Sequence, residues 1–122
     1  MNSNQAIQAY KASKHLNQNP RDVLTAVHEE LYRAISSAKY ADEQNKLDHM
    51  CVHLEKAVQI LTVLVTTLNF SVAGGDGAQL KQYYLRLLGL LNRNEKGAKR
   101  SATYQQFLDL LQPLCQEFRK VR

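Results

Sequence analysis

The sequence contains few side chains whose types and spacing could support chemistry, and the clearest are two histidines. His49 and His53 are four residues apart, which places both imidazoles on one face of a helix, with Asp48 nearby. Such a group could in principle hold a transition metal. The stretch lacks both the glutamate of an HExxH frame and the paired ExxH motifs of carboxylate-bridged bundles. We therefore expect no metal and no cofactor, and interpret both histidines as exposed or half-buried side chains.

The cysteines and the glycine-rich turn form no catalytic pattern either. Cys51 and Cys115 are isolated, and the start, MNSNQAIQAYKASKH, has no secretory signal, so we expect a cytoplasmic protein with reduced thiols. The turn GGDG, residues 74–77, follows an apolar helix and lacks the lysine and hydroxyl residue of a phosphate-binding loop. No Ser, His and Asp order and no Cys and His pair can be argued from so few histidines. The sequence therefore predicts that the protein is not an enzyme.

Part of the formal net charge of +5 lies in one short segment, NRNEKGAKR, residues 92–100. Its basic residues, Arg93, Lys96, Lys99 and Arg100, could contact nucleic acid or an acidic partner. They are not interleaved with stacking aromatic residues, and no clear recognition helix carries them. A solvated basic loop is the simpler interpretation. A helical adaptor that uses this loop to bind nucleic acid or an acidic protein is the alternative function.

Long stretches with little proline or glycine indicate an all-α fold. The 122 residues, of which 44% are hydrophobic, fit a single domain, residues 1–122, with its own core. In NQNPRDVL, Asn19 is expected to cap a helix that begins at Pro20. This helix is predicted to end near Ala41, and its apolar stripe is Leu24, Val27, Leu31, Ile35 and Ala38.

Three further helices are predicted from stripes with spacings of three and four. One is Met50, Leu54, Ala57, Leu61, Leu64 and Leu68; the next is Leu80, Tyr84, Leu87 and Leu91; the last is Tyr104, Phe107, Leu108, Leu111, Leu114 and Phe118. A glycine cluster that should not hold a helix separates the first two, with Asp76 as the expected cap. Ser101 is expected to cap the last helix, and Pro113 to kink or break it.

The short links between these helices favour antiparallel neighbours. We therefore predict an antiparallel up-and-down four-helix bundle over residues 19–122. Residues 1–18 have few apolar anchors, among them Ile7 and Tyr10, and are expected to form a short, loosely docked N-terminal helix.

The stretch VQILTVLVTTLNF, Val58 to Phe70, is apolar on more than one face and too short to span a membrane, which takes about 20 residues. Beside its core stripe runs a second stripe: Val52, Ile60, Val63, Thr67 and Phe70. Tyr83 and Leu90 lie off the main stripe of the next helix. One interpretation is that other parts of the chain cover the second stripe. The other is that both sets form an apolar groove for a partner segment, with Ile7 and Tyr10 as a displaceable lid.

Four motifs occur in an order that resembles the FliS family of flagellar secretion chaperones. They are AIQAYK, NPRDVLTAVHEELYRAISSAK, LEKAVQILTVLVTTLN and LKQYYLRLLGLLNRNE. The residues at matching places are Tyr10, Asn19 with Pro20, Ala57 with Ile60 and Leu61, Leu68 with Asn69, and Leu80 with Tyr83 and Asn92. The resemblance covers nearly the whole chain.

The chain departs from the family pattern at three places. VHEE, residues 27–30, replaces an LYDG-like element, and Lys81 stands where a second tyrosine is usual. The common C-terminal tryptophan is absent, with Phe118 nearby. The sequence therefore resembles a divergent member.

The resemblance implies a cytoplasmic export chaperone that binds the disordered C-terminal region of flagellin. It would prevent premature polymerisation and deliver its client to the flagellar export apparatus. Combined with the second stripe, this gives an expected binding surface of Ile60, Val63, Thr67, Phe70, Tyr83 and Leu90, with Ile7 and Tyr10 as the lid. Export-gate proteins, other flagellar proteins and a second copy of the chain are further candidate partners; nucleic acid and membrane insertion are not expected.

Overall fold

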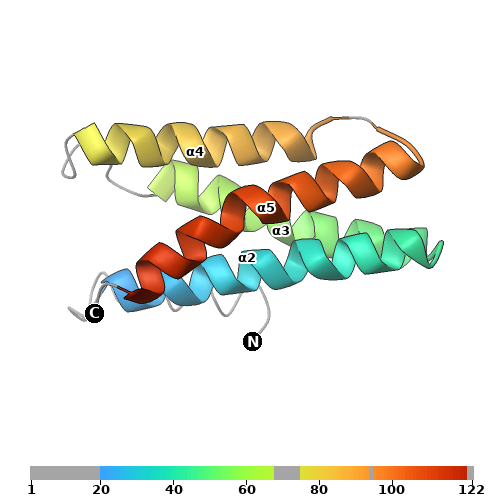
Figure 1. Ribbon diagram of the computed structural model, residues 1–122, viewed down its shortest axis with the longest axis horizontal. Helices are drawn as coiled ribbons and strands as arrows, with labels where there is room; N and C mark the ends of the chain where they lie inside the picture. The colour runs from blue at the N-terminus through green and yellow to red at the C-terminus, as the bar shows by residue number, and fades with distance from the viewer. Residues whose placement is uncertain (1–19, 68–74, 94, 121–122) are drawn as a thin grey trace.

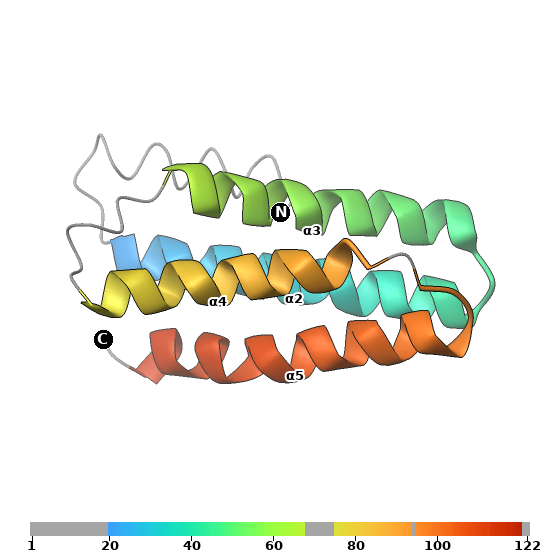
Figure 2. The same ribbon diagram turned by 90° about the horizontal axis from the view of Figure 1, so that it is seen from above.

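The computed structural model of the chain describes residues 20–67, 75–93 and 95–120, which contain four helices (Figure 1). They are α2 (Pro20–Glu43), α3 (Leu47–Thr67), α4 (Gly75–Leu91) and α5 (Ala98–Lys120). Successive helices run in opposite directions, as Figure 2 shows from above. The predicted all-α fold of four packed helices is confirmed. The additional helix predicted within residues 1–18 and the cap at Asn19 lie outside the described residues.

The four helices surround one apolar core. Helix α2 packs against α3 and α5, and α4 packs against the same two helices, so α2 and α4 lie diagonally across the bundle. Each helix contributes one stripe to the core, as its spacing predicts. The fully buried members of the predicted stripes include Leu31, Ile35, Ala38, Ala57, Leu61, Tyr84, Leu87, Phe107 and Leu111.

The turn from α2 to α3 is closed by Asn45. Its φ of 57° lies in the left-handed region, which asparagine tolerates better than most residues. The Lys46 N–H donates to the Ala41 carbonyl at 2.8 Å, and the Asn45 N–H donates to the Asp42 carbonyl at 3.0 Å. These two bonds form a Schellman motif, which satisfies the last carbonyls of α2 and lets α3 begin at once. Helix α2 therefore ends at Glu43, slightly beyond the predicted Ala41.

Both predicted caps beyond α3 are misplaced. Helix α5 begins at Ala98, directly after Gly97, whose φ is +64°, and Ser101 lies in the first turn instead of capping it. The Arg100 N–H donates to the Gly97 carbonyl, so the chain enters the helix earlier than the position of Ser101 suggested. Helix α4 begins at Gly75, one residue before Asp76, so part of the glycine cluster is helical.

The break predicted at Pro113 is absent, because α5 runs as one helix from Ala98 to Lys120. Proline removes the N–H that would bond the carbonyl of Asp109. Both Pro113 and Asp109 are exposed, so water can satisfy that carbonyl and the helix tolerates the proline. None of the four described helices combines the length and apolarity that crossing a membrane requires.

Candidate partner-binding surface

The predicted binding surface is divided between the core and the flanks of the bundle. Ile60 is fully buried and Leu90 is 5% exposed, and both belong to the apolar core. Val63 and Tyr83 are half-buried. Thr67 is the last residue of α3, while Phe70, Ile7 and Tyr10 lie outside the described residues. The binding role of these eight residues stays a prediction. Among the side chains of this set that the structure describes, those of Val63 and Tyr83 are half-buried and those of Ile60 and Leu90 are buried.

Ile60 is buried because the second stripe of α3 borders its neighbour α2. His53 precedes Ile60 by seven residues and so lies on the same side of α3. With Ser37 and Tyr40 of α2, His53 lines a hollow between the two helices. Side chains on this side of α3 therefore face α2, and Val63, three residues after Ile60, follows on the adjoining outer flank.

Tyr83 lies on the opposite flank of the bundle. Burial and the nearby Cys115 thiol of α5 raise the pKa of the Tyr83 phenol, while Arg86 acts in the other direction. Tyr83 therefore lies on the side of α4 that faces α5. It lines a hollow on the outer surface of α4 together with Gln82 and the exposed Leu85. Val63 and Tyr83 thus belong to neighbouring helices but to different flanks, and they do not form one continuous strip.

A buried polar pair that the sequence analysis did not single out joins the diagonal helices. His28 of α2 and Tyr84 of α4 are both fully buried, and the His28 Nε2 and Tyr84 Oη atoms form a hydrogen bond of 2.6 Å. The two ring centroids are 5.7 Å apart. Burial lowers the pKa of His28 from 6.5 to about 4, so the imidazole is neutral at physiological pH.

Spacing alone could have identified His28 as a core residue. It is four residues after Leu24 and three before Leu31, both members of the predicted stripe of α2. His28 also stands within VHEE, where the chain departs from the FliS-like pattern. The departure therefore places a hydrogen-bonding imidazole in the core, opposite Tyr84.

The basic segment is partly neutralised by carboxylates. Arg100 Nη2 lies 2.6 Å from the Asp42 carboxylate of α2, and Arg100 Nε donates to the same oxygen at 2.8 Å. The hydrogen bond to Asp42 raises the pKa of Arg100. Arg93 lies 3.8 Å from Glu95. Two of the four basic residues of this segment, Arg93 and Arg100, therefore form ion pairs with carboxylates of the chain.

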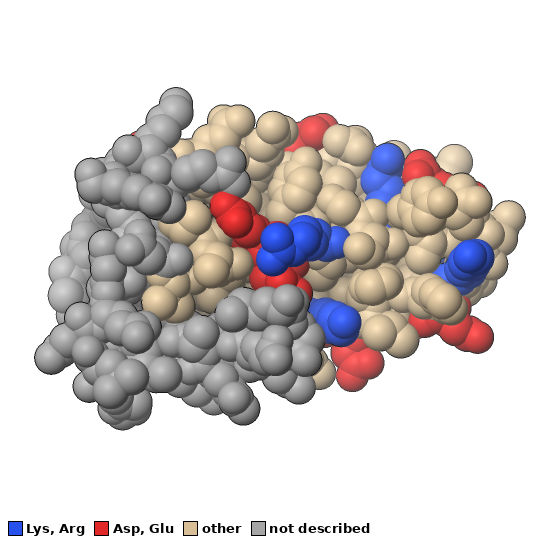
Figure 3. All heavy atoms as spheres, turned by 90° about the horizontal axis from the view of Figure 1, so that it is seen from below, with Lys and Arg blue, Asp and Glu red and all other residues tan. Residues whose placement is uncertain are grey.

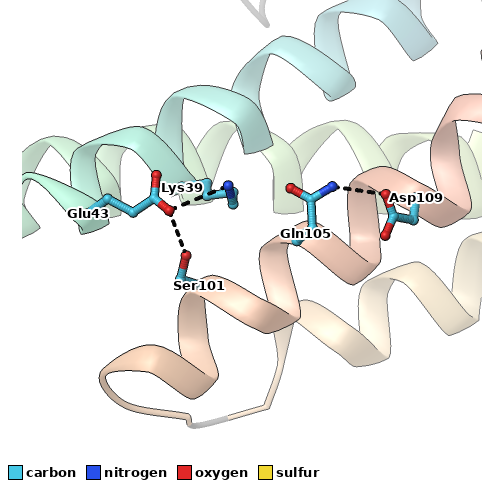
Figure 4. Close-up of polar contacts among 5 residues, drawn as sticks. All are labelled: Lys39, Glu43, Ser101, Gln105 and Asp109. Carbon is cyan, nitrogen blue, oxygen red and sulfur yellow. Dashed lines mark hydrogen bonds and ion pairs between the residues drawn. The ribbon is translucent and has the colours of Figure 1, made fainter.

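The same contacts tie the end of α2 to the start of α5. The Ser101 hydroxyl donates to Glu43 at 3.1 Å, and the same carboxylate lies 3.4 Å from Lys39 (Figure 4). Asp42 is buried beside Arg100. Carboxylates are favourable near the positive end of a helix dipole, so Asp42 and Glu43 of α2 stabilise the first turn of α5.

Charges of both signs are interspersed on the face shown in Figure 3, with uncharged surface between them. This distribution differs from the single-sign patch expected of a nucleic-acid-binding face. Among residues 20–67, 75–93 and 95–120, His, Cys, Asp and Glu side chains form no group of three or more suited to a metal ion. His49 is exposed and His53 half-buried, as expected from the sequence.

The structure is that of an all-α protein, a four-helix bundle with one apolar core and half-buried apolar side chains on its flanks. The chain belongs to the FliS family: the family model described as flagellar protein FliS matches residues 2–122. No curated protein matches the chain significantly.

Family membership confirms the resemblance over nearly the whole chain. It implies a flagellin export chaperone, which works in the cytoplasm and is not an enzyme. Flagellin is the partner that the family implies.

Proposed function

We propose that this chain binds the disordered C-terminal region of flagellin on apolar side chains of its flanks, prevents premature polymerisation and delivers flagellin to the export apparatus. The observation that carries the proposal is the match of the FliS family to residues 2–122. The half-buried Val63 and Tyr83 support it, because each offers apolar surface outside the closed core. Thr67 and Phe70 would extend the surface at the end of α3, and Ile60 and Leu90 would support it from beneath.

A disordered flagellin segment can bind apolar side chains that lie on two different flanks of the bundle. An extended chain advances roughly 3.3–3.6 Å per residue, so a segment of a few tens of residues can contact both Val63 and Tyr83. Ordering such a segment costs about 2–5 kcal/mol, which offsets part of the gain from apolar burial. The complex is then specific enough to protect flagellin and weak enough to release it at the export apparatus.

The division of the chain into a loosely docked segment, residues 1–18, and a bundle, residues 19–122, belongs to the same proposal. Ile7 and Tyr10 would cover the apolar surface until flagellin displaces them. Such a lid reduces the exposed apolar area of the free protein and hence its tendency to aggregate.

Calorimetric titration with a peptide of the flagellin C-terminal region tests the proposal. We expect saturable one-to-one binding with a negative heat-capacity change, the signature of apolar burial. Val63→Asp should weaken binding at least about tenfold, because a carboxylate would be desolvated against an apolar client. Tyr10→Ala should tighten binding if the lid competes with flagellin.

Thr62→Asp is the matched control, since it places the same charge on the neighbouring, exposed position of α3. It should leave the affinity nearly unchanged. Both variants should keep the helical circular-dichroism spectrum and a cooperative melt. An unfolded Val63→Asp protein would show that Val63 supports the core, and equal affinities of the two variants would place the flagellin segment elsewhere.

A further inference from the structure

A hollow between α2 and α3 is not used by the proposed flagellin surface. Ser36, Ser37 and Tyr40 of α2 line one side of it. Lys46 of the turn and His49 and His53 of α3 line the other. The two imidazoles lie one helical turn apart on α3, so both face the hollow from the same wall.

Of the seven lining residues, all but Ala41 carry a side-chain group that can donate a hydrogen bond. Three hydroxyl groups, one ammonium and two imidazoles can all donate, and no described residue contributes a carboxylate to the lining. The two acids that end α2 are engaged elsewhere, since Asp42 pairs with Arg100 and Glu43 with Lys39 and Ser101. Positive charge in this hollow is therefore not neutralised by its own walls.

The ionisable groups that face the hollow are Tyr40 from α2, Lys46 from the turn, and His49 and His53 from α3. Burial, and then the positive charges of Lys56 and His49, lower the pKa of His53. A bound anion would oppose both charge effects and favour the imidazolium form. Anion binding and protonation of His53 should thus reinforce each other.

We propose that this hollow binds a tetrahedral oxyanion of the phosphate or sulfate type through Lys46, His49, His53 and the hydroxyl groups of α2. A tetrahedral oxyanion presents several acceptor oxygens in different directions, which matches donors on two walls and a turn. The site is open, so the affinity should be weak, with a dissociation constant of about 1 mM. The proposal does not depend on flagellin binding.

Sulfate is the probe for the first test, because its charge stays at two between pH 6.0 and 8.0 and any pH dependence then comes from the protein. The full chain is titrated with sodium sulfate and, at matched ionic strength, with sodium chloride, while the amide and imidazole NMR signals are followed. We expect saturable shifts in residues 36–53 with sulfate and none with chloride. Sulfate should bind at least about threefold more tightly at pH 6.0 than at pH 8.0.

Lys46→Gln should weaken sulfate binding by about fivefold or more, because it removes a charged donor. His53→Gln should remove the pH dependence of sulfate binding, because glutamine cannot take up the proton that a bound anion favours on His53. Lys96→Gln is the matched control, since Lys96 is exposed in the loop between α4 and α5 and should have no effect. Shifts that grow linearly with concentration, that chloride reproduces, or that persist unchanged in Lys46→Gln would overturn the proposal.

Inorganic phosphate and vesicles then identify the source of the oxyanion. Saturable phosphate binding without attachment to phosphatidylglycerol vesicles would assign a free phosphate-type ion. Attachment to phosphatidylglycerol but not phosphatidylcholine vesicles, lost in Lys46→Gln, would assign a lipid headgroup. If sulfate, phosphate and both kinds of vesicle all fail to bind, the hollow is not an oxyanion site.

Discussion

The hydrogen bond between His28 and Tyr84 is the main polar feature inside the apolar core. It links α2 to α4, which have no direct backbone contact across the bundle. A buried donor or acceptor that loses its partner costs about 1–3 kcal/mol, so other arrangements of the helices that separate the two rings are disfavoured. The pair therefore helps to fix which residues of α2 and α4 face each other.

The lowered pKa of His28 predicts that acid destabilises the protein. The unfolded chain takes up a proton at His28 near pH 6.5, whereas the folded imidazole stays neutral down to about pH 4. Stability from this residue is thus complete above about pH 6.5 and falls with decreasing pH, by up to about 1.4 kcal/mol per pH unit and about 3 kcal/mol in total. Urea unfolding between pH 4 and 7.5 measures this loss.

Replacing His28 by glutamine should remove that acid-dependent loss while keeping a polar partner for Tyr84. His49→Gln, at an exposed position, should show the acid profile of the unmodified chain. If both variants lost stability equally between pH 6.5 and 4, the acid sensitivity would come from groups other than His28.

The ends of the helices depend more on tertiary contacts than on local residue types. Ser101 has the residue type of a cap, but its hydroxyl bonds Glu43 of α2 instead, and Gly97 determines where α5 begins. Asn45 and Gly97 could be recognised as turn residues from sequence, yet the partner of Ser101 is far away in the chain. Cap prediction failed there because a local rule cannot account for a distant carboxylate.

The ion pair of Arg100 and Asp42 should stabilise the junction of α2 and α5. Arg100→Met leaves the buried Asp42 without its guanidinium, and we expect a loss of about 1–3 kcal/mol in the free energy of unfolding. Thermal or urea unfolding measures it. The double variant with Asp42→Asn should recover part of the loss, since no buried charge then remains.

Lys99→Met serves as the matched control, because Lys99 is the exposed neighbour of Arg100 in the first turn of α5. Its stability should change by less than about 0.5 kcal/mol. If Arg100→Met were as stable as Lys99→Met, the ion pair of Arg100 and Asp42 would make no net contribution to the free energy of unfolding.

At the scale of the whole molecule, the four helices and their core stripes could be predicted from sequence, whereas the surface could not. Spacings of three and four identify the side of each helix that turns inward. They do not determine the order of helices around the core. The sequence predicts Ile60 at the surface because it does not indicate that this side of α3 faces α2. It predicts Leu90 at the surface because it does not indicate how α5 covers α4.

The net positive charge of the molecule should contribute little to client binding. Lys96 and Lys99 are exposed and form no ion pair with the residues that the structure describes. Reversing both to glutamate should leave the affinity for the flagellin peptide within about twofold, and added salt should have little effect. Titration calorimetry at two salt concentrations checks this.

The alternative function, a helical adaptor that binds nucleic acid through the basic segment, predicts a strong effect of salt and of the double charge reversal. If the basic segment bound nucleic acid, its binding would fall steeply with salt, and the same double reversal would abolish it. Fluorescence-anisotropy titration with a labelled duplex, using both proteins, distinguishes the two functions.

The packing of α5 against α2 has a consequence for synthesis on the ribosome. A hairpin of α2 and α3 can form early during synthesis. The side of α2 that packs against α5 stays uncovered until α5 has been synthesised. At about 5–20 residues per second, translation from the end of α3 to the end of α5 takes roughly 3–10 s. For that interval the nascent chaperone itself exposes apolar surface, and it depends on its last described helix before it can protect another protein.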